Sequence, residues 1–279
     1  MSKVVFSPAR INIIAKNTFL EAVRQKFFGF LVIIALGIIL SSQVFRDFNF
    51  GAPELKFIAD FGFGAIVLFG SVLAIVATAQ LFFSEIENKT AITILAKPIF
   101  RSEFIFGKFL GVSLLLLVFT GMMTVILSVL LFWRETAIME GVDPEAFEAG
   151  RMVAYGDIFL YGIVQWLKFS ILCGITMVVA SFSNTNLYSV ILSFVILLIC
   201  HLQYLARDAW AQMEFLPVQL AVFMLSAVFP NFQLFNIGDQ IALGESIPFE
   251  LGARIIGYAL IYIIVFNLLA VFSFRKREI

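Results

Sequence analysis

The chain has 279 residues, of which 61% are hydrophobic and 14% charged, with a formal net charge of zero. Its mean hydropathy is +1.01. Soluble domains usually carry about 25% charged residues, so the composition excludes an ordinary soluble domain and indicates a membrane protein.

Long apolar runs set the predicted architecture. A bilayer core about 30 Å thick needs roughly 20 residues of helix, and backbone groups in lipid must be hydrogen-bonded within the segment. Runs of this length without the strict alternation of barrel strands predict helices. The sequence therefore predicts an all-α integral membrane protein with six transmembrane helices, at about 28–45, 61–83, 109–132, 158–182, 187–205 and 255–274.

The N-terminal segment, residues 1–27, is polar and carries five Lys or Arg residues, which is unlike a cleaved signal peptide. Its apolar positions recur at helical spacing and place Ile14, Ala15 and Thr18 on one side. Such a pattern predicts a helix in the membrane interface that leads into the six-span domain of residues 28–279.

A polar interruption, residues 84–108, separates the second and third runs and contains seven charged residues. Its apolar residues are spaced as in an amphipathic helix, and Pro98 forces a break after Lys97. The pattern predicts a short helix, a bend and a second helix that runs into the third span. A connector that only lies on the bilayer is the alternative.

Positive charges near the spans predict the orientation. Twelve Lys and Arg residues flank the side that holds both termini and residues 84–108, against six on the other side. Since positive residues favour the cytoplasmic side, both termini are expected in the cytoplasm.

The segment between the fifth and sixth runs includes an apolar stretch from Phe215 to Phe229, which is too short to span comfortably. We expect a re-entrant or interfacial segment over about 212–240. A seventh full span would move the basic C-terminal end to the outside and contradict the charge count.

Polar groups inside the predicted spans are few. Lys168 is the one ionisable residue well inside a span, so it is expected to face a cavity or an acidic partner, or to extend its ammonium toward water. We treat it as a candidate pathway residue. His201 has no second ligand at a suitable spacing, so no metal site is expected.

Packing explains the remaining residues of note. Cys173 and Cys200 lie in apolar runs and are expected to act as small hydrophobic residues. Gly70, Ala74 and Thr78 recur every four residues and allow close helix approach, within the chain or between two chains.

The run EIENKTAITILAKPIFRSEFIFGKFLG, residues 85–111, resembles the cytoplasmic signature of ABC type-two exporter permeases. Lys89 stands where many members have Gly. The six-span layout, the N-terminal helix and the basic C-terminal end are also similar to that family. The matching positions are Glu85, Glu87, Thr90, Ile94, Leu95, Pro98, Arg101, Gly107 and Lys108.

The resemblance implies that residues 84–108 couple the spans to a separate ATP-hydrolysing subunit, which would hold the ATP and magnesium. It also implies a second permease chain, as a homodimer or with a paralogue, and a location in the cell inner membrane. The chain itself lacks a phosphate-binding G-x-x-x-x-G-K-[ST] loop, because Gly107-Lys108 is followed by Phe109 and Ser102 occupies the first glycine position. The expected coupling residues are Glu85, Glu87, Lys89, Thr90, Lys97, Pro98 and Arg101.

The sequence fits three classes of function to different degrees. An export permease with an unidentified substrate is the preferred interpretation. Its expected partners are an ATP-binding subunit, a second permease chain and membrane lipid, and no nucleic-acid partner is expected. A force-transmitting ABC membrane subunit that moves partner proteins is the alternative. A membrane enzyme is disfavoured, because the spans offer no convergent catalytic groups, and no catalytic residues or metal ligands are expected.

Overall fold

A computed structural model describes residues 6–45, 54–87, 100–141, 153–210, 217 and 228–275. The elements in these ranges are helices, and the prediction of an all-α membrane protein is confirmed. They are α1 (Pro8–Arg24), α2 (Lys26–Ser41), α3 (Glu54–Glu87), α5 (Arg101–Gly141), α6 (Tyr155–Phe182), α7 (Asn186–Trp210), the 3₁₀-helix η3 (Phe232–Phe235), α9 (Gly238–Ala242) and α10 (Phe249–Arg275).

Five described helices, α3, α5, α6, α7 and α10, are long and apolar enough to cross a membrane. α2 has 16 residues and is too short to cross a membrane alone. Taken together, α1 and α2 are long and apolar enough to do so. The count is therefore five spans, or six when the bent pair is taken as one span.

The bend between α1 and α2 measures 62°. It occurs at one residue, Gln25, whose backbone is extended with φ −69° and ψ 129°. The predicted N-terminal helix thus exists, and its buried residues, Ala15, Thr18 and Ala22, lie on the side that the sequence pattern groups together. Pro8 begins α1 at a position where its missing N–H costs nothing.

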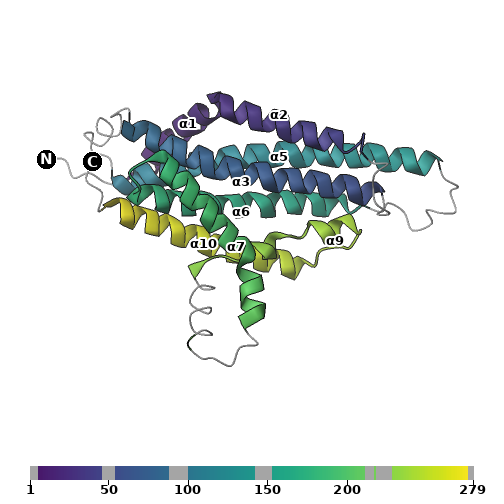
Figure 1. The fold of residues 1–279 in the computed structure, drawn as a ribbon. Coiled ribbons are helices and arrows are strands. Elements are labelled where there is room, and N and C mark those ends of the chain that lie inside the picture. Colours follow the sequence, from purple (N-terminus) through teal and green to yellow (C-terminus); the bar gives the residue numbers. More distant parts are fainter. Residues whose placement is uncertain are drawn as a thin grey trace.

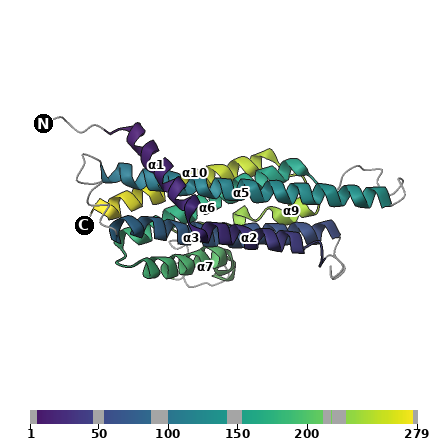
Figure 2. The ribbon, with the colours of Figure 1, turned by 90° about the horizontal axis from the view of Figure 1, so that it is seen from above.

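α6 is the centre of the bundle, because it packs against α3, α5, α7 and α10. Figure 1 shows α3, α5 and α6 running side by side along the length of the molecule, with α10 beside α6. In the view of Figure 2, α1 crosses α5 while α2 runs along α3. The stripe of Gly70, Ala74 and Thr78 is an intrachain contact: a Cβ on Gly70 would overlap the ring of Phe169 on α6.

The bundle has two ends that matter for function. We call the end with residues 6–8, 84–87, 100–101 and 275 the terminal end, because both chain termini lie there (Figure 1). The other end, called the opposite end, holds the start of α3 and the start of α6. Arg134 on α5 binds Glu54 there, with Nη2 3.0 Å from Oε2.

The predicted re-entrant segment of about 212–240 is described only at residue 217 and from residue 228 onward. Its described part packs into the bundle through the fully buried rings of Phe232 and Phe235. After α9 the chain reverses at Gly244, whose φ is 76°, with hydrogen bonds from Gly244 N to Ile241 O and from Glu245 N to Gln240 O. This is a Schellman turn, and glycine is the residue that tolerates its left-handed position.

Candidate functional site

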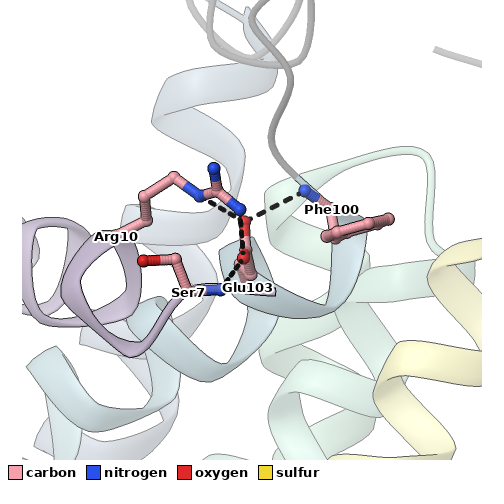
Figure 3. A network of polar contacts seen from close by, with 4 residues as sticks. All are labelled: Ser7, Arg10, Phe100 and Glu103. Atoms are coloured by element: carbon pink, nitrogen blue, oxygen red, sulfur yellow. Dashed lines mark hydrogen bonds and ion pairs between the residues drawn. The ribbon is translucent and has the colours of Figure 1, made fainter. Parts of the chain in front are cut away.

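A buried carboxylate organises the terminal end. The side chain of Glu103, in the first turn of α5, is 0% exposed. Its Oε1 accepts hydrogen bonds from the backbone N–H of Ser7 at 2.7 Å and from Arg10 Nη2 at 2.8 Å. Its Oε2 accepts from Arg10 Nε at 3.0 Å and from the backbone N–H of Phe100 at 3.2 Å. Figure 3 shows the carboxylate enclosed by these donors.

Local sequence explains why Glu103 holds this position. Glu103 is the third residue of α5, and a Glu at that position bonds the free N–H of the residue before the helix, here Phe100. Ser7 precedes α1 and forms no side-chain cap of its own, so the same carboxylate also accepts from the N-terminal end of α1. One negative charge therefore stabilises two helix N-termini, where the helix dipoles favour it.

Two glycines bring α1 and α5 together. A Cβ on Gly107 would lie 2.6 Å from Ile14 Cβ, and one on Gly111 would lie 2.6 Å from Thr18 Cβ and 2.7 Å from the carbonyl oxygen of Ala15. Their four-residue spacing is the small-residue pattern of closely packed membrane helices. Gly107, which the sequence motif includes, thus admits α1 to the surface of α5.

Lys108 ties α5 to α3 and α1. Its side chain is 1% exposed, and Nζ donates to Leu81 O of α3 at 3.0 Å. Nζ also lies 4.0 Å from Glu21 Oε2 of α1. Glu21 in turn accepts from the hydroxyl of Ser84 on α3 at 3.2 Å. The last turns of α3 are therefore held to α5 and to α1.

Arg101 joins the first turn of α5 to the last turn of α10. Its Nη1 donates to Phe274 O at 3.1 Å and to Arg275 O at 2.8 Å. These carbonyls are at a helix C-terminus, where intrahelical donors run out and a cation is favoured. Below this contact the rings of Phe82, Phe104 and Phe274 pack together, with Phe274 5.6 Å from each of the other two centroids.

The sequence-predicted coupling residues are placed unevenly. Arg101 is in the site as described. Glu85 and Glu87 belong to the last turn of α3, and their side chains lie outside the described part of the structure. Lys89, Thr90, Lys97 and Pro98 lie outside the described residues.

Sequence reasoning missed three side chains of the network, Glu103, Arg10 and Glu21. The position of Glu103 three residues after Phe100 is a capping signal in the sequence, and it identifies the local hydrogen bond. No sequence spacing identifies Arg10 as its partner, because the two residues are 93 positions apart.

The candidate pathway residue Lys168 lines a cavity of about 310 Å³ toward the opposite end. Lys168 is 3% exposed, and its Nζ lies 3.3 Å from His201 Nε2. Of the three alternatives expected for Lys168, the structure shows the one in which its side chain lines a cavity. The lining comes from α3, α6, α7, η3 and α9: Asp60, Phe63, Gly64, Val67, Tyr161, Gln165, Lys168, His201, Phe232, Gln233, Asn236, Gly238 and Asp239.

Comparison with protein families identifies the family of the chain. The sequence matches the family described as ABC-2 family transporter protein over residues 11–279, which is nearly the whole chain. A comparison with curated proteins found no match. The matched range includes most of α1, the interrupted segment and the described apolar helices, and the chain therefore belongs to the ABC-2 family of transporter permeases.

Proposed function

We propose that the chain is the permease subunit of an ATP-driven exporter in the cytoplasmic membrane, with both termini in the cytoplasm. In this proposal a separate ATP-binding subunit hydrolyses ATP with magnesium, and two permease chains, identical or homologous, form the transport unit. The family supports a membrane transport subunit with an ATP-binding partner. The excess of positive residues at the terminal end supports the cytoplasmic placement of that end.

The observation that carries the proposal is the way the terminal end is joined. The predicted coupling segment leaves α3 at Glu87 and enters α5 at Arg101. Directly after that entry point, Arg101 holds α10 and Glu103 holds α1. A force applied to the segment by an ATP-binding subunit therefore acts on α5, α1 and α10 together.

The contacts suit mechanical transmission. The helices are joined by hydrogen bonds to a buried carboxylate, by close contacts at two glycines and by a cluster of aromatic rings. Such short-range contacts resist sliding, so the joined helices are expected to move as rigid bodies. α5 is 41 residues long and continues to the opposite end, where Arg134 binds Glu54. Movement at one end of α5 thus reaches the other end without a flexible joint in the described helix.

A specific observation favours transport of a ligand over transmission of force to partner proteins. The cavity at Lys168 places a basic and a polar side chain inside the bundle, and polar groups within spans commonly mark a pathway.

The proposal is tested by purifying the tagged full-length chain from its native membrane in mild detergent and identifying the proteins that remain bound. We expect an ABC-type ATP-binding subunit. Glu87→Lys and Lys97→Glu should each reduce its recovery, because they reverse charges on the predicted contact surface.

Arg134→Gln is the matched control, since it removes a charged residue at the opposite end and should leave recovery unchanged. Absence of any ATP-binding subunit from the intact wild-type complex would remove the energy source and refute the proposal. Equal loss of recovery in all three variants would show a general folding defect in place of a contact surface.

A further inference from the structure

The cavity at Lys168 has a basic floor. Nδ1 of His201 lies 3.0 Å from Leu197 O, and a carbonyl oxygen only accepts, so Nδ1 carries the proton and Nε2 accepts from Lys168 Nζ. The ammonium also lies 5.6 Å from the ring centroid of Phe232. An ammonium has three N–H donors, and the histidine takes one of them.

The charge on Lys168 is not paired with a carboxylate of the described residues. Within the described part of the chain, Lys168 forms no ion pair with a carboxylate. A covered cation in a membrane span is costly unless an anion or a polar group compensates it. The remaining donors of Lys168, which lines the cavity, are therefore suited to an anionic group of a ligand.

Gln165 gives independent support for a ligand. It is 1% exposed and lies one turn from Lys168 on α6. Its Nε2 donates to Phe235 O at 2.8 Å, which fixes the orientation of the amide. Its Oε1 is buried without a hydrogen-bond partner among the described residues, so the cavity offers an unused acceptor to a donor group of a ligand.

The mouth of the cavity is acidic. Asp60 of α3 and Asp239 of α9 both line it, and both are exposed. Gln233 and Asn236, also exposed, add polar groups at the same rim. Two carboxylates in one rim repel each other, and a cation between them relieves that repulsion.

The two charged regions are separated along α6. Tyr161 packs near Gly238, the neighbour of Asp239, and Lys168 follows Tyr161 by seven residues on the same cavity. At 1.5 Å per residue this is roughly 10 Å of helix. The side chains of Lys168, Asp60 and Asp239 all line the cavity, which shortens the distance between the two charged regions. A ligand whose anionic and cationic groups are several ångströms apart therefore fits between them.

We propose that this cavity binds a zwitterionic ligand, with its phosphate or carboxylate on Lys168 and its ammonium between Asp60 and Asp239, while Gln165 Oε1 accepts a hydrogen bond from an N–H or O–H group of the ligand. The acidic mouth disfavours polyanions, and the basic floor disfavours simple cations. A cavity of about 310 Å³ suits a headgroup or a short peptide. The shared chemistry has two sources, an aminophospholipid headgroup and a free zwitterion. As a substrate site the cavity rests on the proposed transport function, but binding itself does not.

The test measures binding to the purified full-length chain in dodecyl maltoside, a nonionic detergent, by isothermal titration calorimetry. Two zwitterionic probes are used: dihexanoyl phosphatidylethanolamine and unblocked trialanine. Dihexanoyl phosphatidylglycerol keeps the phosphate without the amine, and trialanine amide keeps the amine without the carboxylate. We expect at least one zwitterionic probe to bind at least tenfold more tightly than its singly charged counterpart.

Variants assign the two ends of the ligand. Lys168→Met should weaken the zwitterionic probe at least tenfold. Gln165→Glu should also weaken binding of the zwitterionic probe at least tenfold, because the new carboxylate would pair with Lys168. This variant retains Lys168, so it still tests the role of the ammonium if Lys168→Met fails to fold. Asp60→Asn combined with Asp239→Asn should remove the preference for zwitterionic over anionic probe. Arg254→Met, which removes an exposed charge on α10, is the control and should change nothing.

Each outcome decides the proposal. Binding of the phosphatidylethanolamine alone supports a lipid headgroup, binding of trialanine alone supports a free zwitterion, and binding of both supports the shared chemistry. The proposal is overturned if neither zwitterionic probe binds, if singly charged probes bind equally well, or if the Lys168 and Gln165 variants bind as the wild type does. None of these results depends on an ATP-binding subunit, so failure here leaves the co-purification result standing.

Discussion

Replacing Glu103 by Gln should release α1 from α5. The carboxylate accepts four hydrogen bonds, two from Arg10 and two from the backbone N–H groups of Ser7 and Phe100. A glutamine amide has one acceptor oxygen, and its NH₂ group would face donors. The substitution therefore removes the charge and sets N–H groups against one another.

The expected magnitude follows from exposure. Breaking a fully buried ion pair costs about 3–5 kcal/mol, whereas exposed pairs contribute about 0–1 kcal/mol. Glu103 is 0% exposed but the side chain of Arg10 is 30% exposed, so solvent screens part of the interaction. We expect the docking of α1 to lose about 2–3 kcal/mol, which is about 30- to 150-fold in the docking equilibrium.

Cysteine accessibility measures that equilibrium. Thr18 faces Gly111 and is 1% exposed, so a cysteine in the Thr18→Cys background reacts with a water-soluble maleimide only when α1 leaves α5. Glu103→Gln should raise the labelling rate about 30- to 150-fold, following the change in the docking equilibrium. Arg134→Gln, at the opposite end, should leave the rate unchanged. Chains without the added cysteine give the background from the buried Cys173 and Cys200.

A charge exchange separates the ion pair from the helix caps. Arg10→Glu combined with Glu103→Arg restores opposite charges but sets a guanidinium against the backbone N–H groups of Ser7 and Phe100, so fast labelling should persist. An unchanged rate in Glu103→Gln would refute the assignment of Glu103 as the anchor of α1. Full recovery in the exchanged variant would refute its role as a shared cap.

Three further predictions concern other contacts. Gly111→Leu should accelerate labelling at position 18 because its side chain would overlap α1, whereas Gly121→Ala, which has no neighbour within 4 Å of its added Cβ, should not. Arg101→Gln should weaken the contact with the end of α10 by about 1–2 kcal/mol, so that ATP hydrolysis continues while transport in vesicles falls. Gly70→Leu should lower the midpoint of thermal unfolding in detergent, because overpacking against Phe169 costs about 1–3 kcal/mol or more; an unchanged midpoint would contradict the close α3–α6 contact.

The helical architecture was predictable because membrane spans are determined by composition over some 20 residues. The sequence also indicated which residues of α1 share one side, since Ala15 and Thr18 repeat at helical spacing, but it did not indicate that this side packs against α5. The helix ends were less so: the helix expected to run from the segment after Pro98 into the span at 109–132 does begin at Arg101, but it continues to Gly141, beyond the predicted end. Hydropathy identifies the lipid-crossing part of a helix but not its continuation into water.

The pairings within the site could not be predicted from one sequence. Arg10 and Glu103 are 93 residues apart, and Lys168 and His201 are 33 apart. Periodicity reports which side of a helix is apolar, and it carries no information about which helix lies against that side. His201 was therefore interpreted alone, although in the fold it is the acceptor for the one lysine inside a predicted span.

The separation of Arg10 from Glu103 also has a consequence for biosynthesis. Ribosomes add about 5–20 residues per second, so the 93 residues between the two side chains take roughly 5–20 seconds to synthesise. During that interval α1 has already emerged, and α2 follows it, but the carboxylate and the glycines that receive α1 do not yet exist. α1 therefore stays undocked at the membrane surface until α5 is inserted. It can dock only when the third long apolar segment is present in the correct orientation.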